Sequence, residues 1–306
     1  MSWRLHLTNR AVQALDILDG QPPLLAAWSR RDRVAYYDLD TGTQIAETVL
    51  RTLPKEKRQG EDWQLYLSEL VAPNGAFLPH VRTTGLTIYT TDDGRMHLYY
   101  AGDTNLFLYA EGKEIALDVA EAEEFRALAL DRFLGLNAAL AEDGKLHLYQ
   151  QHIRVGAFDV DLHLQQDVMP GLAISRGGGS IFVTDGSRIV LTDSSGKPRK
   201  TLDTHYFIGK MVCSPSGRHL VTSDLESGVL RVYSGSDLTL LRQRFAVDLL
   251  ARAEQVQLMA DPPPSSVALS ALAVDNRGVV AFALGGVICA SSITEMDELP
   301  RPQKLL

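Results

Sequence analysis

Four short segments of the sequence carry an acidic residue one or two positions before a glycine, and their carboxylates could do chemistry. The segments are Asp92-Asp93-Gly94, Glu142-Asp143-Gly144, Asp185-Gly186 and Glu226-Ser227-Gly228. Carboxylates that gather on one rim could bind a divalent cation, or they could attract a basic partner. An acidic residue before glycine also makes a good hairpin turn. Turn formation alone is therefore a second explanation for each of Asp93, Asp143, Asp185 and Glu226.

The familiar catalytic motifs are missing from the sequence. It contains no Gly-x-Ser-x-Gly elbow, no phosphate-binding loop and no His-Glu-x-x-His helix. The glycine run Arg176–Ser180 is predicted to be a hairpin turn between Ile174 and Ile181, because no helix follows it to bind phosphate. His97 and His147 occupy equivalent positions of two similar segments, which favours a structural role. We therefore predict no catalytic residue, no metal ligand and no cofactor.

The composition is that of a globular protein with an excess of acid. The chain has 306 residues, 45% of them hydrophobic and 22% charged, and its formal net charge is −8. A protein that binds a nucleic-acid backbone needs clustered Lys and Arg, which the negative net charge of this chain argues against. We therefore expect a protein partner with a basic patch. The alternating segment Met1–Leu7 is unlike a signal peptide, and no apolar run reaches the roughly 18 residues of a membrane span. We expect a cytoplasmic monomer with no nucleic-acid or membrane partner.

A repeat indicates which elements must position these residues. The segment Asp93–Tyr100 (DGRMHLYY) returns 50 residues later as Asp143–Gln150 (DGKLHLYQ), and a period of roughly 40 to 50 residues is typical of repeat folds. Comparable strands start near Arg33, Arg95, Lys145, Ser187, Val229 and Val287. The fullest unit, Met211–Phe245, contains four strands joined by tight turns, which is one blade of a β-propeller. The sequence thus predicts an all-β protein, a single β-propeller over residues 1–306 with six, alternatively seven, four-stranded antiparallel blades.

Three stretches resemble known blades. Met211–Tyr233, with its Ser-Pro-Ser-Gly turn and its Gly-x-apolar-x-Val-Tyr strand, resembles a WD-repeat blade, and Val34–Gly42 is similar to the end of another. Ile181–Lys197 is closer to the NHL type. The resemblance implies a propeller closed by its terminal strand. It also implies, by analogy, a non-catalytic scaffold for protein interactions.

Ring closure and insertions follow from the same pattern. The strand Trp3–Leu7 has no partner of its own, and the last unit is one strand short, so the first should complete the last blade. Insertions 53–62, 118–126 and 245–266 link consecutive blades and should share a face with the acidic turns. The third insertion is predicted to be helical over Val247–Ala260 and to pack on its own propeller or on a partner. The candidate binding residues are Asp93, Asp143, Asp185, Glu226, Leu249, Leu250 and Val256.

Two functions are compatible with these features. The first is a non-catalytic scaffold that presents loops and an acidic rim on one propeller face. The alternative is a channel-centred enzyme, such as a metal-assisted hydrolase or lactonase. An apolar patch on the loop-bearing face would favour the scaffold, and a tightly bound divalent metal at the channel mouth would favour the enzyme.

Overall fold

The structure is a computed structural model that describes residues 3–6, 12–30, 33–50, 61, 65, 68–83, 86–90, 96–100, 106–110, 113–116, 125–131, 136–150, 153–164, 170–250, 268–284 and 286–298. Its regular elements are almost all β-strands. Across the described ranges, no helix is long and apolar enough to cross a membrane.

The strands form six antiparallel sheets, which we number as blades 1 to 6. Blade 1 contains β2 (Ala14–Leu18), β3 (Leu24–Arg30), β4 (Arg33–Asp38) and β5 (Gln44–Val49); blade 2 contains β6 (His80–Thr83), β7 (Leu86–Thr90), β8 (Met96–Tyr100), β9 (Leu106–Ala110) and β10 (Lys113–Ala116). Blade 3 contains β11 (Phe125–Asp131), β12 (Leu136–Ala141), β13 (Lys145–Gln150) and β14 (Ile153–Asp159); blade 4 contains β15 (Gly171–Ile174), β16 (Ile181–Thr184), β17 (Arg188–Thr192) and β18 (Pro198–Asp203). Blade 5 contains β19 (Ile208–Cys213), β20 (His219–Asp224), β21 (Val229–Ser234), β22 (Leu240–Phe245) and β26 (Asp297–Glu298); blade 6 contains β23 (Ala271–Val274), β24 (Val279–Leu284), β25 (Val287–Ser292) and β1 (Trp3–His6). This confirms the predicted fold class.

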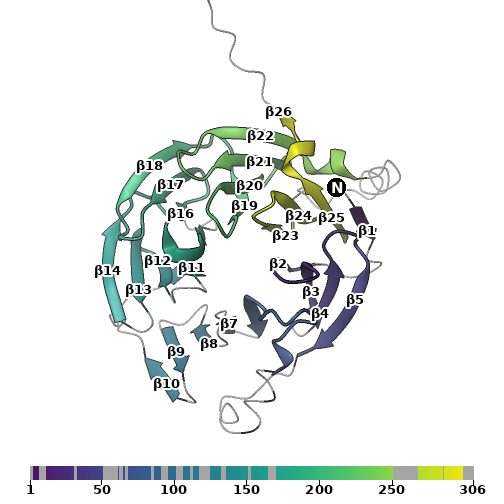
Figure 1. Ribbon diagram of the computed structural model, residues 1–306. Helices are drawn as coiled ribbons and strands as arrows, with labels where there is room; N and C mark the ends of the chain where they lie inside the picture. The colour runs from purple at the N-terminus through teal and green to yellow at the C-terminus, as the bar shows by residue number, and fades with distance from the viewer. Residues whose placement is uncertain are drawn as a thin grey trace, which may run out of the picture.

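The blades stand around a central axis, with the first strand of each blade innermost (Figure 1). Neighbouring inner strands contact one another in ring order: β2 meets β23, β23 meets β19, β19 meets β15, and β15 meets β11. Each of the six strands picked out by the repeat is the third strand of its blade. The repeat in the sequence is therefore the repeat of the fold.

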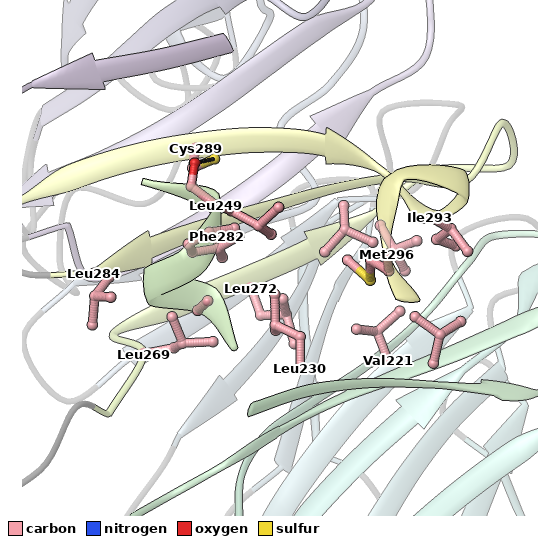
Figure 2. Packing of buried hydrophobic residues seen from close by; sticks show 14 of the residues in the cluster. Val221, Leu230, Leu249, Leu269, Leu272, Phe282, Leu284, Cys289, Ile293 and Met296 are labelled. Carbon is pink, nitrogen blue, oxygen red and sulfur yellow. Dashed lines mark hydrogen bonds between the residues drawn. The ribbon is translucent and has the colours of Figure 1, made fainter. Parts of the chain in front are cut away.

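Buried apolar side chains pack neighbouring blades against one another in the described part of the chain. The seam between blades 5 and 6 shows this well (Figure 2): Val221 and Leu230 of blade 5 pack in one cluster with Leu272 and Phe282 of blade 6. Phe282 is fully buried. A strand with two buried faces reads as a nearly continuous apolar run, as in Val279–Leu284 (VVAFAL).

Strand β1 lies at the outer edge of blade 6, antiparallel to β25, with Trp3 opposite Ala290. The indole Nε1 of Trp3 donates a hydrogen bond to the carbonyl of Leu39 in blade 1 (2.5 Å), and the ring lies against Gly42 of the same turn. On the seam between blades 6 and 1, the guanidinium of Arg277 contacts Asp40 (3.0 Å) as well as Asp275 (2.7 Å). The first strand of the chain thus joins its last blade to its first.

Two blades have a fifth strand that the sequence pattern did not predict. In blade 2 the edge strand β10 pairs with β9, which accounts for the extra strand-like segment between Trp63 and Val119 without a seventh blade among the described residues. In blade 5 the short strand β26 pairs with β22, and two arginines of β22 donate to the carbonyls of Met296 and Glu295. The segment after blade 6 therefore covers the outer edge of blade 5.

The structure also contains three short 3₁₀ turns, η2 (Arg176–Gly178), η3 (Ala246–Leu249) and η4 (Ile293–Glu295), and the described residues 61, 65, 68 and 69 are helical. The glycine run 176–180 joins β15 to β16, as predicted. The predicted helix Val247–Ala260 is wrong at its start, where the structure has η3 followed by an extended Leu250. Residues 251–267 lie outside the described part of the chain, as does most of insertion 53–62 and of insertion 118–126.

Candidate functional site: the loop face of blades 4 and 5

The end of the propeller that carries the blade-to-blade links also carries the turns between second and third strands, because the four strands of a blade alternate in direction. We call this end the loop face. Asp143 lies in the β12–β13 turn, Asp185 in the β16–β17 turn and Glu226 in the β20–β21 turn, so the strand order places all three on the loop face. Asp93 and Val256 lie outside the described residues.

The carboxylates of Asp185 and Asp143 accept hydrogen bonds from backbone N–H groups of their own turns. Asp185 Oδ1 accepts hydrogen bonds from the backbone N–H groups of Ser187 (2.9 Å) and Arg188 (2.8 Å). The following glycine takes a positive φ of 99°, a conformation that glycine adopts without strain. Asp143 accepts from the N–H of Lys145 (3.0 Å) and is ion-paired with its ammonium. Turn formation is thus one role of both acids.

In blade 5 the capping group is Asp224, which the sequence analysis did not single out. Its Oδ1 accepts from the N–H groups of Glu226 (2.9 Å) and Ser227 (3.0 Å). Partial burial raises the pKa of Asp224, but the hydrogen bonds from Ser227 and Glu226 and the charge of Arg231 outweigh it and hold that pKa below its usual value. The predicted residue, Glu226, is exposed beside this cap.

Replacement of Asp185 separates the capping role from the charge. Asp185→Ala removes the acceptor of two backbone N–H groups, and we expect it to lower the free energy of unfolding by about 1 kcal/mol. Asp185→Asn keeps an oxygen at the same place and should stay within about 0.5 kcal/mol of the parent protein. Urea denaturation of the two variants measures the difference; equal losses would show that the hydrogen bonds are not what matters at this position.

The link from blade 4 to blade 5, residues 204–207, bridges two of these turns. Thr204 N–H donates to the carbonyl of Ser187 (2.9 Å) and Ile208 N–H to that of Gly186 (2.6 Å), both in the blade 4 turn. On the other side, Leu225 N–H of the blade 5 turn donates to the carbonyl of Phe207 (2.8 Å). We call residues 204–207 and 225–228 together the link platform.

A hydrogen-bonded cluster holds the link platform in place from below. The hydroxyl of Tyr206 lies 2.7 Å from that of Thr222 and 2.9 Å from that of Tyr233. The guanidinium of Arg231 stacks 3.8 Å from the centre of the Tyr206 ring and pairs with Asp224 (3.4 Å). Tyr206 belongs to the link, Thr222 and Asp224 to β20, and Arg231 and Tyr233 to β21, so the cluster ties the link to two strands of blade 5.

Large apolar side chains are exposed on the link platform. Phe207 is 46% exposed and Leu225 is 43% exposed. Leu225 lies directly over Gly209, where an added Cβ would stand 3.2 Å from the Leu225 Cα. Phe245, at the end of β22, is also exposed, and it pairs with Val229 next to the same turn. A cluster of exposed aromatic and aliphatic side chains on a rigid surface is typical of a protein-binding site.

Two predicted binding residues belong to the core instead. Leu249 is 6% exposed and Leu250 is 3% exposed, and both pack in the cluster between blades 5 and 6 (Figure 2). The apolar spacing that suggested a partner-binding helix reflects burial against the chain's own blades. The candidate surface therefore no longer includes Leu249 and Leu250, and Phe207 and Leu225 take their place.

Solved structures with a similar arrangement of blades identify the fold. A chain in the crystal structure of the mitotic checkpoint complex is 12% identical, with a TM-score of 0.56 and coverage of 95% of this chain and 93% of that chain. The β-propeller domain of Myceliophteria thermophila Cps50 (Swd1) is 13% identical, with a TM-score of 0.61 and coverage of 93% and 98%. The chain has the fold of a β-propeller.

The designed protein Ika8 is also similar to this propeller, with 13% identity, a TM-score of 0.52 and coverage of 94% of this chain and 98% of the designed one. No protein-family model and no curated protein sequence matches the chain. The likeness is therefore one of fold, and function must be argued from the surface of this propeller itself.

The central channel of the propeller contains a cavity of about 600 Å³ between the inner strands. Its charged lining residues include Asp16, Asp131, Arg176 and Lys210, set among small and apolar side chains. Cys213 also lines the cavity, and burial raises the pKa of its thiol to about 12, so the thiol stays protonated at neutral pH. In the described part of the chain, no three His, Cys, Asp or Glu side chains are grouped to hold a metal ion.

Proposed function

We propose that the chain is a non-catalytic scaffold that binds a protein partner through its loop face. The observation that carries this proposal is the exposed pair Phe207 and Leu225 on the link platform. Their backbones are hydrogen-bonded to each other, and Thr204 at the start of the link and Ile208 directly after it are hydrogen-bonded to the blade 4 turn. The apolar surface is therefore held ready for binding, and little order has to be gained on association.

The charge around the pair supports a partner with a basic patch. Around the Asp185 turn, the link platform and the link from blade 3 to blade 4, this face carries the carboxylates of Asp161, Asp185, Asp203, Asp224 and Glu226 beside the guanidiniums of Arg188 and Arg231. A surface of net negative charge speeds the approach of a positively charged partner and disfavours acidic ones. One of the structurally similar chains comes from a complex, which fits a role in assembly.

Affinity capture with a matched pair of variants tests the proposal. Immobilised parent protein and a Phe207→Ser/Leu225→Ser variant are incubated with extract of the source cells, and the retained proteins are identified and quantified. We expect the variant to retain at least about tenfold less of the specific partner, because central apolar residues carry most of the energy of an interface.

The matched control is Ile153→Ser/Val155→Ser, which removes two apolar side chains that are somewhat more exposed (63% and 54%) from the outer strand of blade 3. This variant should retain the partner like the parent protein. Equal capture by all three proteins would refute the loop face as the binding surface. Turnover of an ester or lactone by the purified protein would favour the channel-centred enzyme instead.

A further inference from the structure

The link platform has a definite pattern: apolar in the middle and acidic on both sides. Phe207 and Leu225 are adjacent through the hydrogen bond between Leu225 N–H and the Phe207 carbonyl (2.8 Å). On the blade 4 side, Ser187 of the Asp185 turn contacts Thr204, at the start of the same link. On the blade 5 side, Glu226 directly follows Leu225. A ligand that covers the apolar pair therefore meets carboxylates in both directions.

The guanidiniums on this surface are already engaged by these carboxylates. Arg188 is hydrogen-bonded to Asp203 (2.9 Å) and lies 3.7 Å from Asp161. Arg231 pairs with Asp224 and stacks on Tyr206. Of the side chain of Asp161, 88% is accessible, and Glu226 is exposed as well. Because the five carboxylates around the platform outnumber the two guanidiniums, the outer parts of the platform keep an excess of negative charge.

We infer that the link platform binds a linear segment of a partner protein in which an aromatic or aliphatic residue stands between basic residues. The apolar side chain would cover Phe207 and Leu225, and the basic side chains would face Glu226 on one side and the Asp161–Asp185 side on the other. This inference rests on the proposed function and adds the chemistry of the partner. A short segment fits better than a broad interface, because the surface consists of one four-residue link and the neighbouring turns.

Peptide selection tests the inference with a defined probe. A display library of random linear peptides is selected on the parent protein and, in parallel, on Phe207→Ser/Leu225→Ser. We expect peptides enriched only on the parent protein, with a net positive charge and with Phe, Leu, Ile, Met or Trp between Lys or Arg residues. A labelled copy of the most enriched peptide is then titrated by fluorescence polarisation.

The titration separates the two components of the site. The apolar double variant should raise the Kd of that peptide at least about tenfold. A charge variant, Asp161→Asn/Glu226→Gln, should raise it several-fold and should reduce its salt dependence, since charge attraction is screened by salt. Asn is the suited replacement at Asp161, whose φ is 52°. The variant Ile153→Ser/Val155→Ser should bind the peptide like the parent protein.

Several results would overturn the inference. They are a lack of enriched peptides, enrichment of acidic or purely apolar peptides, and binding that is indifferent to both platform variants. If captured protein partners still depend on Phe207 and Leu225 in those cases, the proposed scaffold function stands and only the partner chemistry fails. If basic–apolar peptides bind the platform but no protein is captured from extract, the site stands and the scaffold function fails.

Discussion

Deletion of residues 1–7 should lower the free energy of unfolding by roughly 3–5 kcal/mol. The deletion removes strand β1, whose four residues pair with β25 at the edge of blade 6. It also removes Trp3, whose indole bonds to Leu39 and packs on Gly42 in blade 1. The loss opens the ring and leaves blade 6 with an uncovered edge, which favours pairing with other chains. Thermal and urea unfolding measure the first effect, and light scattering at rising protein concentration measures the second.

The control for this deletion is Gln44→Ala on the outer strand β5 of blade 1. Gln44 is exposed, so the free energy of unfolding should change by no more than about 0.5 kcal/mol. If the deleted chain unfolds at the same temperature and denaturant concentration as the parent protein, Trp3 and β1 do not hold the ring closed. The seam would then depend on other contacts, such as those of Arg277 with Asp40 and Asp275.

The fold could be predicted from the sequence because its signal is local and repeated. In each blade a tight turn is followed by a mostly apolar third strand. The segments that begin at Asp93 and Asp143 both contain this turn and strand in sequence. The fullest unit, Met211–Phe245, matches the strands β19 to β22 within three residues at its start and to the residue at its end. Turn residues and period-two alternation depend on neighbours in the chain, so a single sequence shows them.

The candidate site was harder to predict because its geometry is not local. Phe207 and Leu225 are brought together by hydrogen bonding between a link and a turn, and two whole strands, β19 and β20, separate them in the sequence, so no local pattern connects them. Both would have been assigned to the core as apolar residues. The opposite error occurred at Leu249, where an apolar pattern next to a long insertion suggested a binding surface. Exposure is a property of the assembled blades, and only the structure shows it.

The turn cap in blade 5 shows the same limit on a smaller scale. The pattern of an acid before glycine indicated Glu226, whereas the backbone N–H groups of the turn are bound by Asp224, the last residue of β20, two positions earlier. In the Asp185 turn the same pattern identified the capping residue itself. The two turns differ in length: residues 225–228 separate β20 from β21, whereas residues 185–187 separate β16 from β17. Glu226 therefore lies outside the cap, with its side chain exposed to solvent.

Leu249→Ala should destabilise the propeller by roughly 2–4 kcal/mol. Leu249 is buried in the cluster that joins blades 5 and 6, together with Leu230, Leu272 and Phe282 (Figure 2), and truncation leaves a cavity that the surrounding strands cannot fill without moving. The effect should appear as a lower midpoint of urea unfolding with an unchanged slope, because the compactness of the two states is preserved.

The matched control is Phe245→Ala, four residues earlier, where the side chain is 50% exposed. This variant removes a larger apolar group, yet it should lower the free energy of unfolding by only about 1 kcal/mol, since half of that side chain is already exposed in the folded protein. The binding readout then distinguishes core from surface. At temperatures where Leu249→Ala remains folded, its affinity for the captured partner should equal that of the parent protein. Leu249 is only 6% exposed, so its side chain has almost no surface that a partner could contact. A stable Leu249→Ala protein that has lost its partner would place this residue back on the binding surface and would remove it from the seam.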